Sequence, residues 1–262
     1  MMSAVRSIFG FFWFIGRKAR RTRVLALLCA LPILAALIIQ SQKWFSGAIR
    51  MDGLKIFSDI IMAFYLQFIV LILSLFFGTS VVSEEVEGKT LPFLTTRPVS
   101  KPAIILGKYG ASLALSSLLI AGGVIGSFVL LASDRLGSPA AWGTLGRNLG
   151  VLLLGLVVYM AVFTFAGTFL KKSILFGLFF SFGWENVVQY FPGSTQKFTI
   201  IHYLKSILRP DVAPESGPLS FLAFHLQPTP LVSAVLILLA IAAIALAAAA
   251  FVFSRREYLF EE

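Results

Sequence analysis

Charged residues are scarce in this chain, and acidic residues are the scarcest of them. Asp, Glu, Lys and Arg together make up 13% of the 262 residues, which is about half the share in an ordinary soluble domain. Hydrophobic residues make up 58%, and the mean hydropathy is +0.90. The composition therefore excludes a soluble globular domain and predicts a membrane protein.

Cysteine and histidine are almost absent, which removes several kinds of site. The single cysteine, Cys29, stands in an apolar run, so an intrachain disulfide is impossible. The two histidines, His202 and His225, have no cysteine or aspartate at ligand spacing, so we expect no metal site. No nucleophile is paired with a base, so we expect no catalytic residue and no enzyme activity.

The net charge of +10 does not indicate nucleic-acid binding, because of where the cations stand. They flank the apolar runs, and a basic block precedes the first run: Arg17, Lys18, Arg20, Arg21 and Arg23. Cations at membrane edges suit membrane topology and anionic lipid headgroups. Membrane lipid is therefore an expected partner, and nucleic acid is not.

Six apolar runs are long enough to cross a bilayer. A helix needs about 17–25 residues to cross a hydrocarbon core near 30 Å, and runs this long and continuous form helices in lipid. We expect an all-α membrane protein, residues 1–262 forming one transmembrane domain, with spans at about 24–40, 60–82, 109–132, 149–170, 173–191 and 231–253.

Lys and Arg counts in the flanks predict the orientation of these spans. More cations lie on the side that holds both termini, including four between the second and third spans: Lys89, Arg97, Lys101 and Lys108. Cytoplasmic loops carry the excess of Lys and Arg, so both termini are expected in the cytoplasm.

Two further segments are expected at the membrane surface. Residues of about 5–20 combine five aromatics with a basic block, which favours an interfacial amphipathic helix over a disordered basic tail. The outer connection between spans five and six, 192–230, contains a moderately apolar stretch at 198–208. This stretch predicts a short re-entrant or interfacial helix.

The cytoplasmic connection between spans two and three contains Gly88-Lys89-Thr90, the tail of a phosphate-binding loop. That motif needs a glycine five residues before Gly88, where Ser83 stands, so we expect no ATP site in this chain. The connection instead predicts a short charged helix at about 84–95. Two interpretations of this segment are equally open: it docks on a cytosolic partner, or it is an ordinary interfacial loop. The residues concerned are Glu84, Glu85, Val86, Glu87, Gly88, Thr90, Leu91 and Leu94.

Four polar residues stand in or beside predicted spans, namely Gln67, Glu185, Asn186 and Gln189. A buried acid in a membrane is a candidate functional residue. The alternative for Glu185 and its neighbours is a structural cluster at the outer interface that caps the span. Gln67 either bonds to another helix or lines a path.

The connection also resembles a known family. Residues 76–109, FFGTSVVSEEVEGKTLPFLTTRPVSKPAIILGKY, are similar to the ABC-2 type permeases in the positions Ser83, Glu84, Glu85, Gly88, Thr90, Leu91, Leu94, Pro98, Val99, Ser100, Gly107 and Lys108. In the family pattern a charged residue often precedes an adjacent Gly-Thr pair. This chain departs from it, because Lys89 stands between Gly88 and Thr90. Residues 184–207 resemble the subgroup that includes permeases for nitrous-oxide-reductase maturation and gliding motility.

The resemblance implies the membrane subunit of an ATP-driven ABC transporter, an exporter in a bacterial inner (plasma) membrane. Two permeases, either two copies of this chain or this chain and a homologue, would pair with two cytosolic ATPase subunits. This chain would bind no cofactor, because ATP and Mg would lie on the ATPase. The helix at 84–95 would be the coupling helix that docks on it.

Two other functions remain open at this point. An ATPase-linked scaffold that transmits force without moving a substrate would use the same coupling helix. An ion-driven secondary transporter would need several ionisable groups within its spans, and only Glu185 qualifies.

Overall fold

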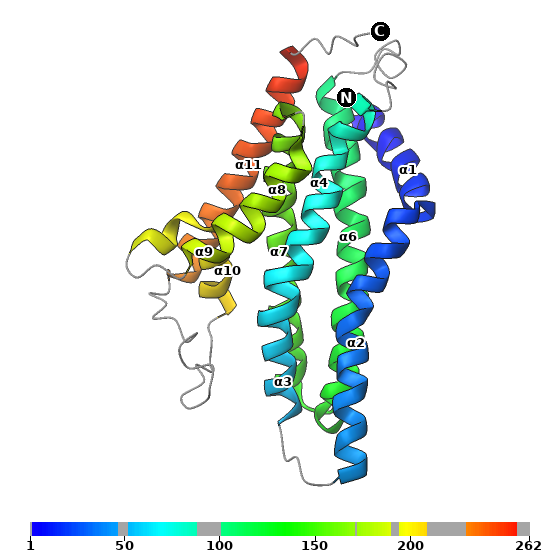
Figure 1. Cartoon of the computed structure of the whole chain (residues 1–262), viewed down its shortest axis with the longest axis vertical. Coiled ribbons are helices and arrows are strands. Elements are labelled where there is room, and N and C mark those ends of the chain that lie inside the picture. The colour runs from blue at the N-terminus through cyan, green and yellow to red at the C-terminus, as the bar shows by residue number, and fades with distance from the viewer. Residues whose placement is uncertain are drawn as a thin grey trace.

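The computed structural model describes residues 2–46, 52–87, 101–170, 172–189, 194–208 and 229–255. Every regular element within these ranges is helical, and the long helices run side by side (Figure 1). This is the all-α membrane fold expected from the apolar runs, because a helix satisfies its own backbone hydrogen bonds in lipid.

The helices follow one another in a simple order. The long ones are α1 (Met2–Lys18), α2 (Arg20–Ser46), α4 (Val70–Glu87), α6 (Lys101–Leu131), α7 (Pro139–Phe169) and α11 (Leu231–Arg255). The short ones are α3 (Gly53–Ile60), α8 (Ser173–Leu178), α9 (Asn186–Val188) and α10 (Ile200–Leu208). Two π-helices, η1 (Ile61–Ile69) and η3 (Phe179–Glu185), and two 3₁₀ turns, η2 (Ser133–Arg135) and η4 (Ser194–Phe198), complete the described elements.

Five helical stretches of the described chain are long and apolar enough to cross a membrane: Arg20–Gln42, Gly53–Ser83, Lys101–Leu131, Pro139–Phe169 and Leu231–Arg255. The fifth of the six expected spans differs. It is the shorter apolar helix Ser173–Val188, about 24 Å long at 1.5 Å per residue, which falls short of a 30 Å core. The chain is a multi-pass membrane protein, and its described residues include five helical stretches long enough to span and one shorter apolar helix.

Helices α4, α6 and α7 form the centre of the bundle. α2 and α1 pack on α6, and α11 packs on α7. Close approach of α2 and α6 depends on Gly123, because a Cβ there would lie 2.7 Å from the Cys29 carbonyl oxygen and 2.8 Å from the Tyr65 hydroxyl. Small residues let membrane helices approach in this way.

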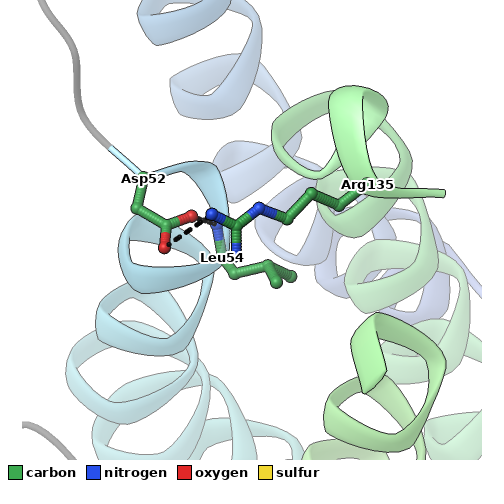
Figure 2. Close-up of polar contacts among 3 residues, drawn as sticks. All are labelled: Asp52, Leu54 and Arg135. Atoms are coloured by element: carbon green, nitrogen blue, oxygen red, sulfur yellow. Dashed lines mark hydrogen bonds and ion pairs between the residues drawn. The ribbon is translucent and has the colours of Figure 1, made fainter. Parts of the chain in front are cut away.

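The two ends of the bundle are built differently. At one end lie α1, the end of α4, the start of α6 and the end of α11 (Figure 1). At the other end, the turn after α6 meets the start of α3. Arg135 Nη2 lies 3.4 Å from Asp52 Oδ2, while Asp52 Oδ1 accepts a hydrogen bond from the Leu54 backbone N–H (Figure 2).

Candidate functional site

The predicted coupling helix begins inside the helix of the second span. α4 continues through Glu87, so the backbone of Glu84, Glu85, Val86 and Glu87 extends this span. The side chains of these four residues lie outside the part of the chain that is described, as do Gly88, Thr90, Leu91 and Leu94 entirely. Docking through this segment therefore stays a prediction.

Residues that flank the predicted coupling helix in the chain belong to a small apolar cluster. Val81 and Val82 of α4, Ile105 of α6 and Phe253 of α11 are buried together, apart from the main core. Close by, the Lys101 ammonium donates a hydrogen bond of 3.3 Å to the Ser254 carbonyl. The cluster therefore joins α4 and α6, the two helices that flank residues 88–100 in the chain, to α11.

The first helix packs tightly on the start of α6. A Cβ at Gly107 would lie 2.7 Å from Ile8 Cγ2, so only glycine allows α1 to approach this closely. Next to it, the buried Lys108 ammonium lies 4.6 Å from the centre of the Phe12 ring. Gly107 and Lys108 both belong to the family pattern, and their structural role is to hold α1.

A second site surrounds the carboxylate of Glu185, which is completely buried. Oε1 accepts a hydrogen bond of 3.1 Å from the Ile200 backbone N–H, and Oε2 accepts one of 3.0 Å from Ile201. The Tyr159 hydroxyl of α7 donates to Oε2 at 2.8 Å. The first N–H groups of a helix lack partners within it and favour a negative group. Glu185 therefore caps α10 from a different helix.

The other predicted polar residues lie next to this cap. Gln189 Oε1 accepts a hydrogen bond of 2.7 Å from the Lys205 ammonium and lies 3.5 Å from Gln67 Nε2. Gln189 Nε2 donates to Asn186 Oδ1 at 3.1 Å, and Asn186 Nδ2 donates to the Ser181 carbonyl. All four predicted residues thus belong to one region, where α9, α10 and η1 meet.

Both π-helices contribute to this region. Gln67 belongs to η1 and Glu185 to η3, and the rings of Phe68 in η1 and Phe182 in η3 meet edge to face at 5.9 Å. π-Helical turns occur frequently at functional sites, because they change which side chains face a neighbour.

α10 itself is buried along its whole length. Each residue from Ile200 to Leu208 is buried, and the helix lies partway along the bundle against α7 and α11 (Figure 1). Gly155, in the middle of α7, makes room for it, since a Cβ there would lie 3.2 Å from Leu204 Cδ1. Of the apolar stretch expected at 198–208, the helix Ile200–Leu208 is therefore enclosed by protein, whereas Phe198 before it is 75% exposed.

Sequence reasoning missed four members of this region, namely Tyr159, Lys205, His202 and Thr229. Tyr159 stands in an uninterrupted apolar run, and nothing there points to its hydroxyl bond. Lys205 is buried, and its place within the apolar stretch 198–208 is a signal of that burial. The His202 ring lies 3.1 Å from the Thr229 hydroxyl, which ties α10 to the start of α11.

The bundle of long apolar helices defines the class as a multi-pass membrane protein. The sequence model of the ABC-2 family transporter proteins matches residues 9–258, and the chain belongs to this family. No curated protein matched the chain in the comparison made.

This match confirms the resemblance to ABC-2 permeases and the expected transmembrane transport class. Members of the family are membrane subunits without a nucleotide-binding domain of their own. The likeness to the nitrous-oxide-reductase maturation and gliding-motility subgroup stays a prediction.

Proposed function

We propose that this permease forms, with a second copy of itself or a homologous permease, the membrane part of an exporter driven by a separate cytosolic ATPase. Two ATPase subunits would bind ATP and Mg. The proposal also places the chain in a bacterial inner membrane with both termini in the cytoplasm.

The observation that carries this proposal is the cluster that joins the helices on either side of residues 88–100 in the chain. These two flanking helices, α4 and α6, rest with α11 on the cluster of Val81, Val82, Ile105 and Phe253. A coupling element must transmit displacement to the spans rather than absorb it. Three helices joined at one end by a packed cluster meet that requirement.

The acidic start of the connection suits docking on a protein surface. Glu84, Glu85 and Glu87 follow directly on the apolar part of α4, so the helix presents charge as soon as it leaves the spans. In this proposal the ATPase seats Glu84, Glu85, Val86, Glu87, Gly88, Thr90, Leu91 and Leu94, and its closure on ATP pushes α4 and α6.

The surroundings of Glu185 favour an anchoring role over ion transport. The carboxylate already accepts hydrogen bonds from Tyr159, Ile200 and Ile201, two of them from backbone groups that have no other partner in the helix. An ion-driven carrier needs a group that exchanges its ion, so this arrangement supports ATP-driven transport with Glu185 as a structural cap.

Site-directed crosslinking tests the docking site. Leu91→Cys and Leu94→Cys would be made separately in a Cys29→Ala background, and the complex would be purified from native membranes. The control is Gly137→Cys at the opposite end of the bundle, where a side chain meets open space. We expect a crosslink to a nucleotide-binding subunit from positions 91 and 94 and none from 137.

Two outcomes would contradict the proposal in different ways. A permease that never copurifies with an ATPase would overturn ATP-driven function altogether. A copurified ATPase that crosslinks at neither Leu91 nor Leu94 would overturn only the docking site. Nucleotide-dependent ATPase cycling without movement of any solute into vesicles would favour the force-transmitting scaffold.

A further inference from the structure

Basic side chains gather where α1 joins α2. Arg17 and Lys18 end α1, Arg20 begins α2, and Arg23 follows one turn later, all four exposed. The chain has no acidic residue before Asp52, so neither α1 nor α2 carries a negative side chain. Arg21 is different, because its guanidinium lies 5.3 Å from the centre of the Phe77 ring on α4. The four exposed cations are thus not required for packing in the way that Arg21 is.

An exposed apolar face lies beside these cations. α1 packs on α6 through Ile8, Phe12 and Gly16, as their contacts with Gly107, Lys108 and Leu115 show. Three other side chains of α1 are exposed, namely Phe11 at 58%, Phe14 at 61% and Ile15 at 47%.

The same face continues onto the first span. Val24 is 60% exposed and Leu27 71% exposed, on a helix that is long and apolar enough to cross the membrane. Only Ala19 separates α1 from α2, and the Thr22 hydroxyl closes the corner by donating to the Gly16 carbonyl at 2.6 Å. The apolar surface that faces lipid along α2 therefore extends onto α1.

Cationic and apolar groups are in direct contact at this corner. The Lys18 ammonium lies 4.3 Å from the centre of the Phe14 ring, and the Arg17 guanidinium 5.9 Å from that of Trp13. A ligand that fits both groups carries negative charge next to long apolar chains.

We propose that the α1–α2 corner, made of Phe11, Phe14, Ile15, Arg17, Lys18 and Arg20, binds an anionic phospholipid. The phosphate lies against Arg17, Lys18 and Arg20, and the acyl chains lie along Phe14, Ile15 and the adjoining Val24. Membrane lipid is the occupant because the apolar part is continuous with the exposed surface of a span. Basic residues at this depth attract anionic headgroups.

Native mass spectrometry of the purified permease tests this proposal, with phosphatidylglycerol and phosphatidylcholine of the same chain length as probes. The variant is Arg17→Gln/Lys18→Gln/Arg20→Gln. The matched control, Lys55→Gln/Arg147→Gln/Lys197→Gln, removes the same charge from exposed positions elsewhere.

We expect the unaltered protein to bind phosphatidylglycerol in preference to phosphatidylcholine. Each cation near a membrane surface contributes about fivefold to the attraction of anionic lipid, so the variant should lose more than about tenfold in phosphatidylglycerol binding. Its phosphatidylcholine binding should not change, and the control should behave like the unaltered protein.

Equal binding of the two lipids, or an equal loss in variant and control, would overturn the proposal. Should the variant fail to fold, the unaltered protein decides the matter, since raising the salt concentration must weaken phosphatidylglycerol binding selectively. Salt-independent binding would contradict a phosphate held by these cations. The ATPase is absent from the experiment, so its outcome leaves the docking site untouched.

Discussion

The Tyr159 hydroxyl on α7 and the Glu185 carboxylate at the end of η3 lie 2.8 Å apart, and this bond links the cap of α10 to the centre of the bundle. Thr199, directly before α10, is a residue type that often caps a helix. Its hydroxyl instead donates to the Gln196 carbonyl at 2.7 Å. The N–H groups of Ile200 and Ile201 therefore depend on Glu185, and α10 is held by a residue that lies on another helix.

Replacing Glu185 by Ala should loosen α10. Two buried backbone N–H groups would lose their acceptor, which costs about 1–3 kcal/mol for each group left without a partner. We expect a lower thermal unfolding midpoint in detergent and faster hydrogen exchange at Ile200–Leu208. The exposed acid Asp134 supplies the control, since Asp134→Ala should change neither quantity. Unchanged exchange in the Glu185 variant would show that the cap does not hold α10.

Gln189 should matter more than Gln67, although both are amides in the same region. Gln189 Oε1 accepts from the Lys205 ammonium at 2.7 Å, whereas Gln67 reaches Gln189 only at 3.5 Å. Hydrogen bonds to charged groups contribute about 1.5–3 kcal/mol, and long neutral ones contribute less. Thermal unfolding should show a clear loss for Gln189→Leu and a small one for Gln67→Leu. A larger loss for Gln67→Leu than for Gln189→Leu would show that the contact made by Gln67 of η1 contributes more to stability.

Two adjacent glycines of α6 give a test of helix packing. In Gly123→Val, the new side chain would meet the Cys29 carbonyl and the Tyr65 hydroxyl at less than 3 Å, whereas a side chain at Gly122 meets open space. Overpacking costs about 1–3 kcal/mol. We expect a lower yield of folded, monodisperse protein for Gly123→Val than for Gly122→Val. Equal yields would contradict the close approach of α2 and α6.

The ion pair in Figure 2 should contribute less to stability than the helix cap on the same carboxylate. Arg135 is 54% exposed and Asp52 43% exposed, and exposed pairs contribute about 0–1 kcal/mol. Loss of the cap on Leu54 costs about 1 kcal/mol. The thermal unfolding midpoints of Arg135→Ala and Asp52→Asn should therefore be close to that of the unaltered protein. The midpoint of Asp52→Ala should be lower. A large loss of stability in Arg135→Ala would show that the ion pair holds η2 to the start of α3.

The sequence predicted the class and most of the spans, because a long apolar run has a single stable form in lipid. Helix ends were less predictable. α6 begins at Lys101 rather than 109 and α7 at Pro139 rather than 149, because a helix can continue past the apolar run that marks its span. Lys108, for example, is buried by Phe12 of α1.

Some members of the polar region were predicted from the sequence, but their connections were not. Glu185, Asn186 and Gln189 stand out because polar residues are rare in such a segment. Their partners do not stand out in the sequence. Tyr159 is one aromatic residue among many, and Ile200 and Ile201 take part through backbone N–H groups, which almost every residue has. Contacts between residues far apart in the chain depend on how the helices are arranged, which periodicity does not report.

The cap on α10 has a consequence for the order in which the protein is made. Glu185 precedes Ile200 in the chain, so the acceptor leaves the ribosome before the N–H groups that need it. Tyr159 is already in place by then. The segment from α8 to α10 can thus enter the membrane with these backbone groups satisfied, before the final helix is synthesised. The cap itself needs no residue of α11, which packs on α10 once it has been made.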